Sequence, residues 1–300
     1  MDVLSKTNQP SKKHDNLKDI AHTTLKAIEA GSITFANSYL DLTARVRFSN
    51  HNTRYYPPDD LSSSRWALDV PTLPSTKTEI SILEISTLDG ARRLYDTLSR
   101  SSTNFGRIAV LNFASATRPG GGFLGGAQAQ EESIARSSTL YPSLMTDTAQ
   151  EFYKLHQRDR RGGFYHHAMI YTPSVVIFRN DVGEWVAPFE VDILTCAAVN
   201  ASDVRNKNGK HADHAKVEST IELAMKERMG RILSLMEQQG AKNLVLGSFG
   251  TGVFRNSVNM VARIWADLLT SKGARYRSSF DHVVFAILGT STFTTFKQAF

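Results

Sequence analysis

The chain has 300 residues and 41% hydrophobic content, which suits one large domain with a core of its own. It contains no apolar run of the roughly 18 residues that a spanning helix needs and no signal-like start. Its single cysteine, Cys196, excludes an intrachain disulfide and a multi-cysteine zinc site. We therefore expect an intracellular protein, cytoplasmic or nuclear, whose formal charge of +6 favours an anionic ligand; because the basic residues are scattered, direct nucleic-acid binding is the weakest alternative.

The N-terminal part of the chain has little periodicity. Residues 1–15 are polar, and we expect them to form a disordered lead. Apolar positions at helical spacing predict a helix over 16–30, which ends at Gly31. We expect residues 16–77 to form an extension, partly helical and partly irregular, that packs on the core.

Residues 78–300 alternate between strand-like and helix-like segments. Strands are predicted at 79–86, 107–114, 174–178, 189–198, 243–249 and 282–289. Helices are predicted at 88–98, 213–239 and 256–271. Because this alternation implies crossover connections, we predict an α/β fold of three layers, with a mixed, largely parallel sheet between helices. Such a sheet binds ligands beyond the carboxyl ends of its strands.

A glycine-rich loop, RPGGGFLGGAQAQEES, follows the buried strand at 107–114. It carries three consecutive glycines and, after seven intervening residues, a Gln-Glu-Glu run: Gly120, Gly121, Gly122, Gln130, Glu131 and Glu132. Glycines let backbone amides approach a ligand closely. The glutamates also fit an ordinary helix start, where carboxylates stabilise the amides of the first turn, but that alternative does not account for the glycines.

A second glycine-rich loop, LGSFGTGVFRNS, follows the strand at 243–249 and opens a helix. Its amides are suited to wrap an anion beside the helix N-terminus. It matches neither a Walker loop nor the dinucleotide fingerprint. Two such loops at strand ends of one sheet indicate a diphosphate held between them, and Phe254 either packs on a sugar or belongs to the core.

At these residues the sequence resembles a known family. The triple glycine followed by Gln-Glu-Glu is similar to the signature of poly(ADP-ribose) glycohydrolases, and the surrounding NFASATRPGGGFLGGAQAQEESIARSSTLY resembles their microbial-type branch. The GSFGTGVF loop is similar to the family's diphosphate-binding loop. The resemblance covers roughly residues 80–300 and implies a macrodomain-like core that binds the terminal ADP-ribose of a chain.

The resemblance also implies roles for the matched residues. Glu132 would be the catalytic acid and base, Glu131 would hydrogen-bond the ribose next to the scissile bond, and Gln130 would support their loop. Phe254 would fix the distal ribose. Other branches of the family carry Asn where this chain has Ser115, so a ribose contact there stays open. The diphosphate would be held by the two loops, with contacts from Gly120, Gly121, Gly122, Ser248, Gly250, Thr251, Gly252, Val253 and Phe254.

The chemistry favours a single catalytic carboxylate. Glycosidases usually divide proton donation and water activation between two carboxyl groups roughly 5–9.5 Å apart. Neighbouring side chains on a helix diverge by about 100°, so Glu131 and Glu132 are not expected to flank the bond as such a pair. We expect Glu132 to donate the proton and then to accept one from water. A carboxylate partly buried beside another should have a raised pKa, and the mechanism needs neither metal nor cofactor.

Several other residues have simpler explanations. His211 and His214, and the pair His166–His167, lack an evident third metal ligand. Cys196 lies in an apolar strand and is expected to be inert, while Trp265 and the helix at 217–236 are expected to belong to the core.

Three hypotheses about function therefore remain: a glycohydrolase that acts mainly at chain ends of poly(ADP-ribose), a hydrolase of mono-ADP-ribosyl conjugates, and an ADP-ribose reader without activity. The expected partners are poly(ADP-ribose) or ADP-ribose and ADP-ribosylated proteins, and the protein is expected to be a monomer without membrane contact.

Overall fold

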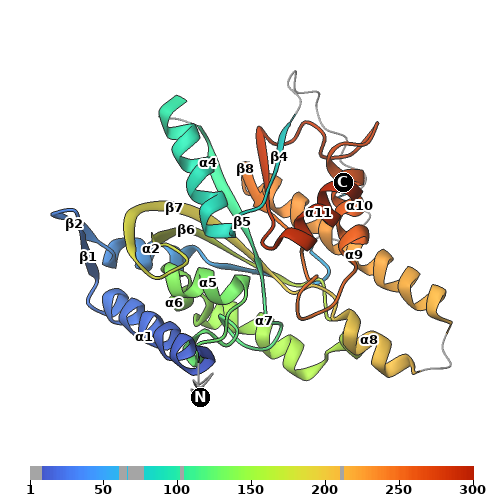
Figure 1. The fold of residues 1–300 in the computed structure, drawn as a ribbon, viewed down its shortest axis with the longest axis horizontal. Helices are drawn as coiled ribbons and strands as arrows, with labels where there is room; N and C mark the ends of the chain where they lie inside the picture. Colours follow the sequence, from blue (N-terminus) through green and yellow to red (C-terminus); the bar gives the residue numbers. More distant parts are fainter. Residues whose placement is uncertain (1–8, 61–65, 67–77, 102–104, 210–212) are drawn as a thin grey trace, which may run out of the picture.

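The computed structural model describes residues 9–60, 66, 78–101, 105–209 and 213–300. Among these residues, seven strands form one mixed sheet at the centre of the fold, in the order β3-β6-β7-β5-β8-β9-β4 (Figure 1). The five strands from β7 to β4 are parallel to their neighbours, whereas β3–β6 and β6–β7 pair antiparallel. The strands are β3 (Arg54–Tyr56), β4 (Glu79–Leu83), β5 (Arg107–Phe113), β6 (Met169–Arg179), β7 (Trp185–Cys196), β8 (Ala241–Leu246) and β9 (His282–Ala286).

Helices cover both faces of this sheet, as predicted. Successive residues of β5 point to opposite faces, so Ile108 and Val110 join one core cluster and Ala109 and Leu111 the other. One face carries α4 (Thr87–Ser101), α5 (Gln130–Ser137), α6 (Leu140–Leu144) and α7 (Asp147–Arg158). The other carries α8 (Ala201–Asn208), α9 (His214–Gln238), α10 (Val258–Leu269) and α11 (Thr290–Ala299). The predicted three-layer α/β/α architecture is therefore confirmed. No helix within the described residues combines the length and the apolar character needed to cross a bilayer.

The N-terminal part contributes directly to the core. It contains α1 (Gln9–Glu29), a hairpin of β1 (Ser32–Phe35) and β2 (Ser38–Asp41), α2 (Thr43–Asn52) and the edge strand β3. Ala21 of α1 packs against Phe123 and Ala135, and Thr24 Oγ1 donates a hydrogen bond to the carbonyl of Arg136 at 2.6 Å. Helix α1 therefore lies against α5 and the short 3₁₀ helix η1 (Phe123–Gly125), which belongs to the first glycine-rich loop (Figure 1).

The predicted elements are present with shifted bounds. Helix α1 begins at Gln9 rather than near residue 16, and residues 1–8 of the expected lead lie outside the described residues. Strand β6 begins at Met169, whereas the sequence predicts its start at residue 174. The difference arises because Pro173 interrupts the strand pattern. There the register with β7 shifts between Thr172 and Val175, which is the kind of irregularity that admits a proline inside a sheet.

Candidate active site

Two glycine-rich loops meet at one edge of the sheet. The first, residues 114–129, follows the carboxyl end of β5, and the second, residues 247–257, follows that of β8. Because β5 and β8 are neighbouring parallel strands, both loops lie at the edge where such sheets bind ligands. Gly120, Gly121 and Gly250 have φ angles of +67°, +61° and +74°, a region that only glycine adopts without strain. The structure thus brings the two predicted loops together.

Gln130 joins the start of α5 to the end of β5. Its Oε1 accepts a hydrogen bond from the backbone N–H of Phe113 at 2.8 Å. Its Nε2 donates to the carbonyl of Leu111 at 2.7 Å and to Thr87 Oγ1 at 3.3 Å. Since both sides of the amide are engaged with β5, the side chain fixes the direction in which the next two residues leave the sheet.

Glu131 is the deeply buried member of the glutamate pair, with 3% of its surface exposed. Its Oε2 accepts a hydrogen bond from the N–H of Ser115 at 2.6 Å, and Asn112 Nδ2 donates to Oε1 at 3.4 Å. Burial, reinforced by the negative charge of Glu132, raises the pKa of Glu131 to about 8 in spite of these hydrogen bonds. This carboxyl is therefore mostly protonated at neutral pH.

Glu132 is half-buried and faces the triple glycine. Its Oε1 accepts a hydrogen bond from the N–H of Gly122 at 2.9 Å. A Cβ atom at Gly121 would overlap the Glu132 carboxylate and would lie 3.0 Å from Glu131 Oε2. Both carboxylates therefore border the same stretch of the first loop, although the two residues are adjacent on α5, and only a glycine at position 121 leaves them room.

The second loop is held by side chains of the core. Trp265 of α10 donates a hydrogen bond from Nε1 to the carbonyl of Gly247 at 3.1 Å. Asn256 is buried, and its Nδ2 donates to the carbonyls of Val199 at 2.7 Å and Gly250 at 3.0 Å. The loop ends where α10 begins, so amides of the first helical turn, which lack intrahelical acceptors, lie beside it. A loop built in this way offers backbone amides to an anion.

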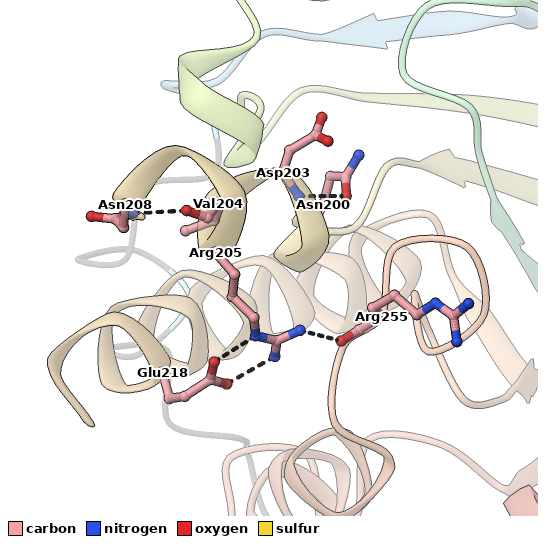
Figure 2. Close-up of polar contacts among 7 residues, drawn as sticks. All are labelled: Asn200, Asp203, Val204, Arg205, Asn208, Glu218 and Arg255. Carbon is pink, nitrogen blue, oxygen red and sulfur yellow. Dashed lines mark hydrogen bonds and ion pairs between the residues drawn. The ribbon is translucent and has the colours of Figure 1, made fainter. Parts of the chain in front are cut away.

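Helix α8 fixes the far end of the second loop (Figure 2). Arg205 makes a two-pronged contact with Glu218 at 2.6 and 2.9 Å and donates from Nη1 to the carbonyl of Arg255 at 2.8 Å. Ser202 N–H donates to the carbonyl of Phe254 at 3.2 Å. Arg255 has a φ of +58°, an unfavourable conformation for a side-chain-bearing residue. The hydrogen bond from Arg205 therefore holds the second loop at Arg255, where the backbone is strained.

Phe254 occupies an intermediate position between core and surface. It is half-buried, packs against both core clusters, and its ring centroid lies 5.9 Å from that of Tyr165. Tyr165 itself has a φ of +51°. The preceding Val253 is 80% exposed. Phe254 is thus a packing residue whose ring is also partly accessible at the site, and its contact with a sugar stays a prediction.

A buried arginine supports the segment that carries Tyr165. Arg228 of α9 is fully buried, and its guanidinium donates to the carbonyls of Ala197, Phe164 and Tyr165 at 2.9, 2.7 and 3.2 Å. Its Nε donates to Nδ1 of His167 at 3.3 Å. Burial lowers the pKa of Arg228 to about 10, so it still carries its charge at neutral pH. Arg228 therefore connects the residue that follows β7 with the segment that carries Tyr165.

The residues that the sequence set aside lie outside the two loops. Cys196 is buried at the end of β7, and burial raises the pKa of its thiol to about 12, as expected of an inert core residue. His214 is the first residue of α9, and His211 lies outside the described residues. His166 lies 3.3 Å from the carboxylate of Asp159, and His167 contacts the buried Arg228. Within the described part of the chain, no three potential metal ligands are grouped.

Sequence reasoning missed several residues that shape the site. Asn112 is buried in β5 and contacts both Glu131 and Thr195; a polar residue in an otherwise apolar strand was the available signal. Trp265 was interpreted as packing alone, but it also holds the second loop. Arg205 gives no such signal, because its acceptor is a backbone carbonyl 50 residues away.

Comparison with known proteins adds an independent observation. Residues 21–180 match the family described as microbial-type PARG, catalytic domain. Among solved structures, the fold is similar to poly(ADP-ribose) glycohydrolase from Thermomonospora curvata, with a TM-score of 0.82 and 33% identity over 95% of this chain and 100% of that one. The form of that protein bound to the inhibitor ADP-HPD gives a TM-score of 0.80 and 34% identity over the same shares.

A second bacterial structure is similar over a smaller part of the chain. Poly(ADP-ribose) glycohydrolase from Deinococcus radiodurans in complex with ADP-ribose matches with a TM-score of 0.71 and 32% identity, over 85% of this chain and 96% of that one. No curated protein sequence matches the chain.

Proposed function

The chain belongs to the family of microbial-type poly(ADP-ribose) glycohydrolases, and we propose on that premise that it hydrolyses the ribose–ribose O-glycosidic bonds of poly(ADP-ribose), mainly from chain ends, and releases ADP-ribose. Its expected partners are the polymer and the ADP-ribosylated proteins that carry it. Membership of the family supports the activity, and the geometry of the two loops supports the division of roles among residues that follows.

The single observation that carries this proposal is the position of Glu132. Its carboxylate borders the triple glycine, is held by the N–H of Gly122, and stays partly accessible, whereas Glu131 beside it is buried. Binding of ADP-ribose alone does not require an accessible carboxylate at this point. The alternative of a reader without activity leaves that feature without a purpose.

Glu132 performs both proton transfers in the proposed mechanism. It donates a proton to the ribose oxygen that departs from C1″, so that the C–O bond breaks as an oxocarbenium-like centre develops. The ionised Glu132 then accepts a proton from the water that attacks C1″. Glu131, protonated at neutral pH, is suited to donate a hydrogen bond to a ribose oxygen.

The second loop holds the diphosphate in the same scheme. Backbone amides between Ser248 and Phe254, together with the N-terminal amides of α10, supply donors without carrying a formal charge. Gly120 to Gly122 face the diphosphate from the other side. Phe254 packs on the distal ribose and so limits the movement of C1″ relative to Glu132. Binding energy from the diphosphate thereby positions the bond that is cut.

The test of this function is a comparison of two substrates. Purified protein is incubated with poly(ADP-ribose) of defined length and, separately, with a mono-ADP-ribosylated protein, and released nucleotide is separated by chromatography. Release of ADP-ribose from the polymer, with chains that shorten gradually, supports a glycohydrolase acting at chain ends. Release from the mono-ADP-ribosylated protein alone would assign the site to the second hypothesis, and binding of both without release would make the protein a reader.

A further inference from the structure

Exposed cations gather on one side of the candidate site. They are contributed by the first loop, the end of α7, the 3₁₀ helix η2 (Arg161–Gly163) with the residue before it, α8 and the second loop. Within the described residues none of them takes part in a salt bridge. We call this set the basic strip, and its members are Arg118, Arg158, Arg160, Arg161, Lys207 and Arg255.

The elements that carry the basic strip are bonded to one another. Gln157 Nε2 donates a hydrogen bond to the carbonyl of Thr117 at 2.9 Å, which joins the last turn of α7 to the first loop. Asn200 N–H donates to the carbonyl of Gly163 at 2.8 Å, which joins η2 to the start of α8. A Cβ atom at Gly162 would lie 3.9 Å from Cδ of Lys207. The strip is therefore one surface rather than a set of separate charges.

The basic strip begins at the end of the site where the two glutamates lie. Ser115, whose N–H holds Glu131, also accepts at its Oγ a hydrogen bond from the N–H of Arg118 at 3.2 Å, and α7 is bonded to the residue before Arg118. On the other side, Tyr165, which follows η2, contacts the ring of Phe254. Helix α7 and η2 thus flank the end of the site that holds Glu131 and Phe254, and the strip leads outward from there.

The charge of the basic strip is only partly balanced. Three carboxylates lie among or beside its members. Glu151 lies near Arg158 but is paired with Lys154 at 2.9 Å. Asp159 accepts from the N–H of Arg161 at 2.8 Å and pairs with His166 at 3.3 Å, and the third carboxylate is that of Asp203. The guanidinium of Arg205 is engaged by Glu218 and a backbone carbonyl and is therefore not a member of the basic strip. The Arg255 side chain points away from that pair (Figure 2). A net positive surface remains for an anionic partner.

We propose, building on the function proposed above, that the basic strip binds the diphosphate groups of the ADP-ribose units that lie beyond the scissile bond. The part of the polymer that is not released must leave the site past Glu132, and each of its units carries a diphosphate. The basic strip starts at that end and offers spaced cations. Its members outside the two loops would therefore favour polymers over mono-ADP-ribosyl conjugates without contact to the terminal unit.

The experiment compares two triple variants in a Glu132→Gln background, so that polymer is not consumed during binding. One variant removes three cations of the basic strip that lie away from both loops: Arg158→Gln, Arg161→Gln and Lys207→Gln. The matched control removes three exposed cations from other surfaces: Arg93→Gln, Arg263→Gln and Lys272→Gln. Affinities for poly(ADP-ribose) of defined length, free ADP-ribose and a single-stranded RNA of equal charge are measured over a range of salt concentrations.

The proposal predicts that the basic-strip variant loses affinity for the polymer by roughly tenfold to a hundredfold, with a log–log salt slope lower by about 2, since each lost phosphate contact removes about 0.7 from the slope of a single-stranded polyanion. Affinity for free ADP-ribose should stay at the level of the control. Equal polymer affinity in the two variants would overturn the proposal, and so would an equal loss for RNA, which would make the surface a general polyanion site.

The outcomes also separate this proposal from the proposed function. Tight, strip-dependent binding of polymer by a wild-type protein that releases no ADP-ribose would leave the basic strip standing and refute the glycohydrolase. For cleavage, the same three substitutions of the basic strip are made with Glu132 intact. Cleavage of polymer at equal rates by the wild-type protein and by this active triple variant, at substrate concentrations below KM, would refute the strip and leave the glycohydrolase standing.

Discussion

Replacing Glu131 with Gln should change the way in which stability depends on pH. Glu131 is 3% exposed and its pKa is about 8 in the folded protein, against 4.5 for the unperturbed group. Between these values the folded state keeps a proton that the unfolded chain releases. Because the unfolded state then binds fewer protons, the free energy of unfolding falls as the pH rises through this window. The Glu131→Gln variant carries a neutral amide at every pH and so would lack this contribution.

The size of the effect follows from the shift in pKa. One pKa unit corresponds to about 1.4 kcal/mol, so a rise from 4.5 to about 8 gives a total on the order of 5 kcal/mol, fully present as stability below pH 4.5 and lost by pH 8. Over two pH units inside that window, the wild-type protein should lose about 3 kcal/mol relative to Glu131→Gln.

The assay is urea unfolding of both proteins at several pH values between about 5 and 9, without ligand. Other titrating groups contribute equally to both proteins, so the difference in free energy of unfolding isolates Glu131. A difference that does not vary with pH would show that desolvation does not dominate at this carboxyl. A difference that grows in favour of the wild-type protein as the pH rises would mean that the hydrogen bonds from Ser115 and Asn112 keep Glu131 ionised.

Two further substitutions test how the loops are built. Gly121→Ala places a Cβ against the Glu132 carboxylate at a φ of +61°. We expect a loss of stability of about 1–3 kcal/mol and a fall in kcat/KM of roughly a hundredfold or more. The control, Gly125→Ala, has open space around the new Cβ and should behave as the wild type in the same unfolding and rate measurements. Arg205→Lys removes the two-pronged contact with Glu218. We expect KM for polymer to rise about threefold to tenfold with kcat nearly unchanged, because Arg205 bonds to Glu218 and to the loop rather than to the two glutamates of α5, and a loop shift of this kind costs about 1 kcal/mol. A fall in kcat alone would contradict that role.

The central layers of this fold could be predicted because their sequence signals are local. Strand β5 is apolar on both faces and is followed at once by the glycines and the Gln-Glu-Glu run. Strand β8 is followed in the same way by the second loop. Since neighbouring parallel strands end at one edge, two local patterns were sufficient to place both loops at the same site.

The remaining features depend on contacts between distant segments. Strand β3 is three residues long and is defined only by its pairing with β6. The contribution of α1 to the first loop rests on the packing of Ala21 against Phe123 and on the hydrogen bond from Thr24 to the backbone of α5. Periodicity reveals that such segments exist, but it does not reveal their partners. The support that α1 and β3 give to the fold around the site was therefore beyond the reach of the sequence.

The most direct test of the account is the release of ADP-ribose from poly(ADP-ribose) by the wild-type protein, Glu132→Gln and Glu131→Gln, with affinity for free ADP-ribose measured in parallel. We predict that Glu132→Gln binds ADP-ribose within about threefold of the wild type while its release rate falls by at least about a thousandfold, because the group that protonates the departing ribose oxygen is lost. A Glu132→Gln protein that still releases ADP-ribose at a rate near that of the wild type would contradict the assignment of Glu132 as the catalytic acid.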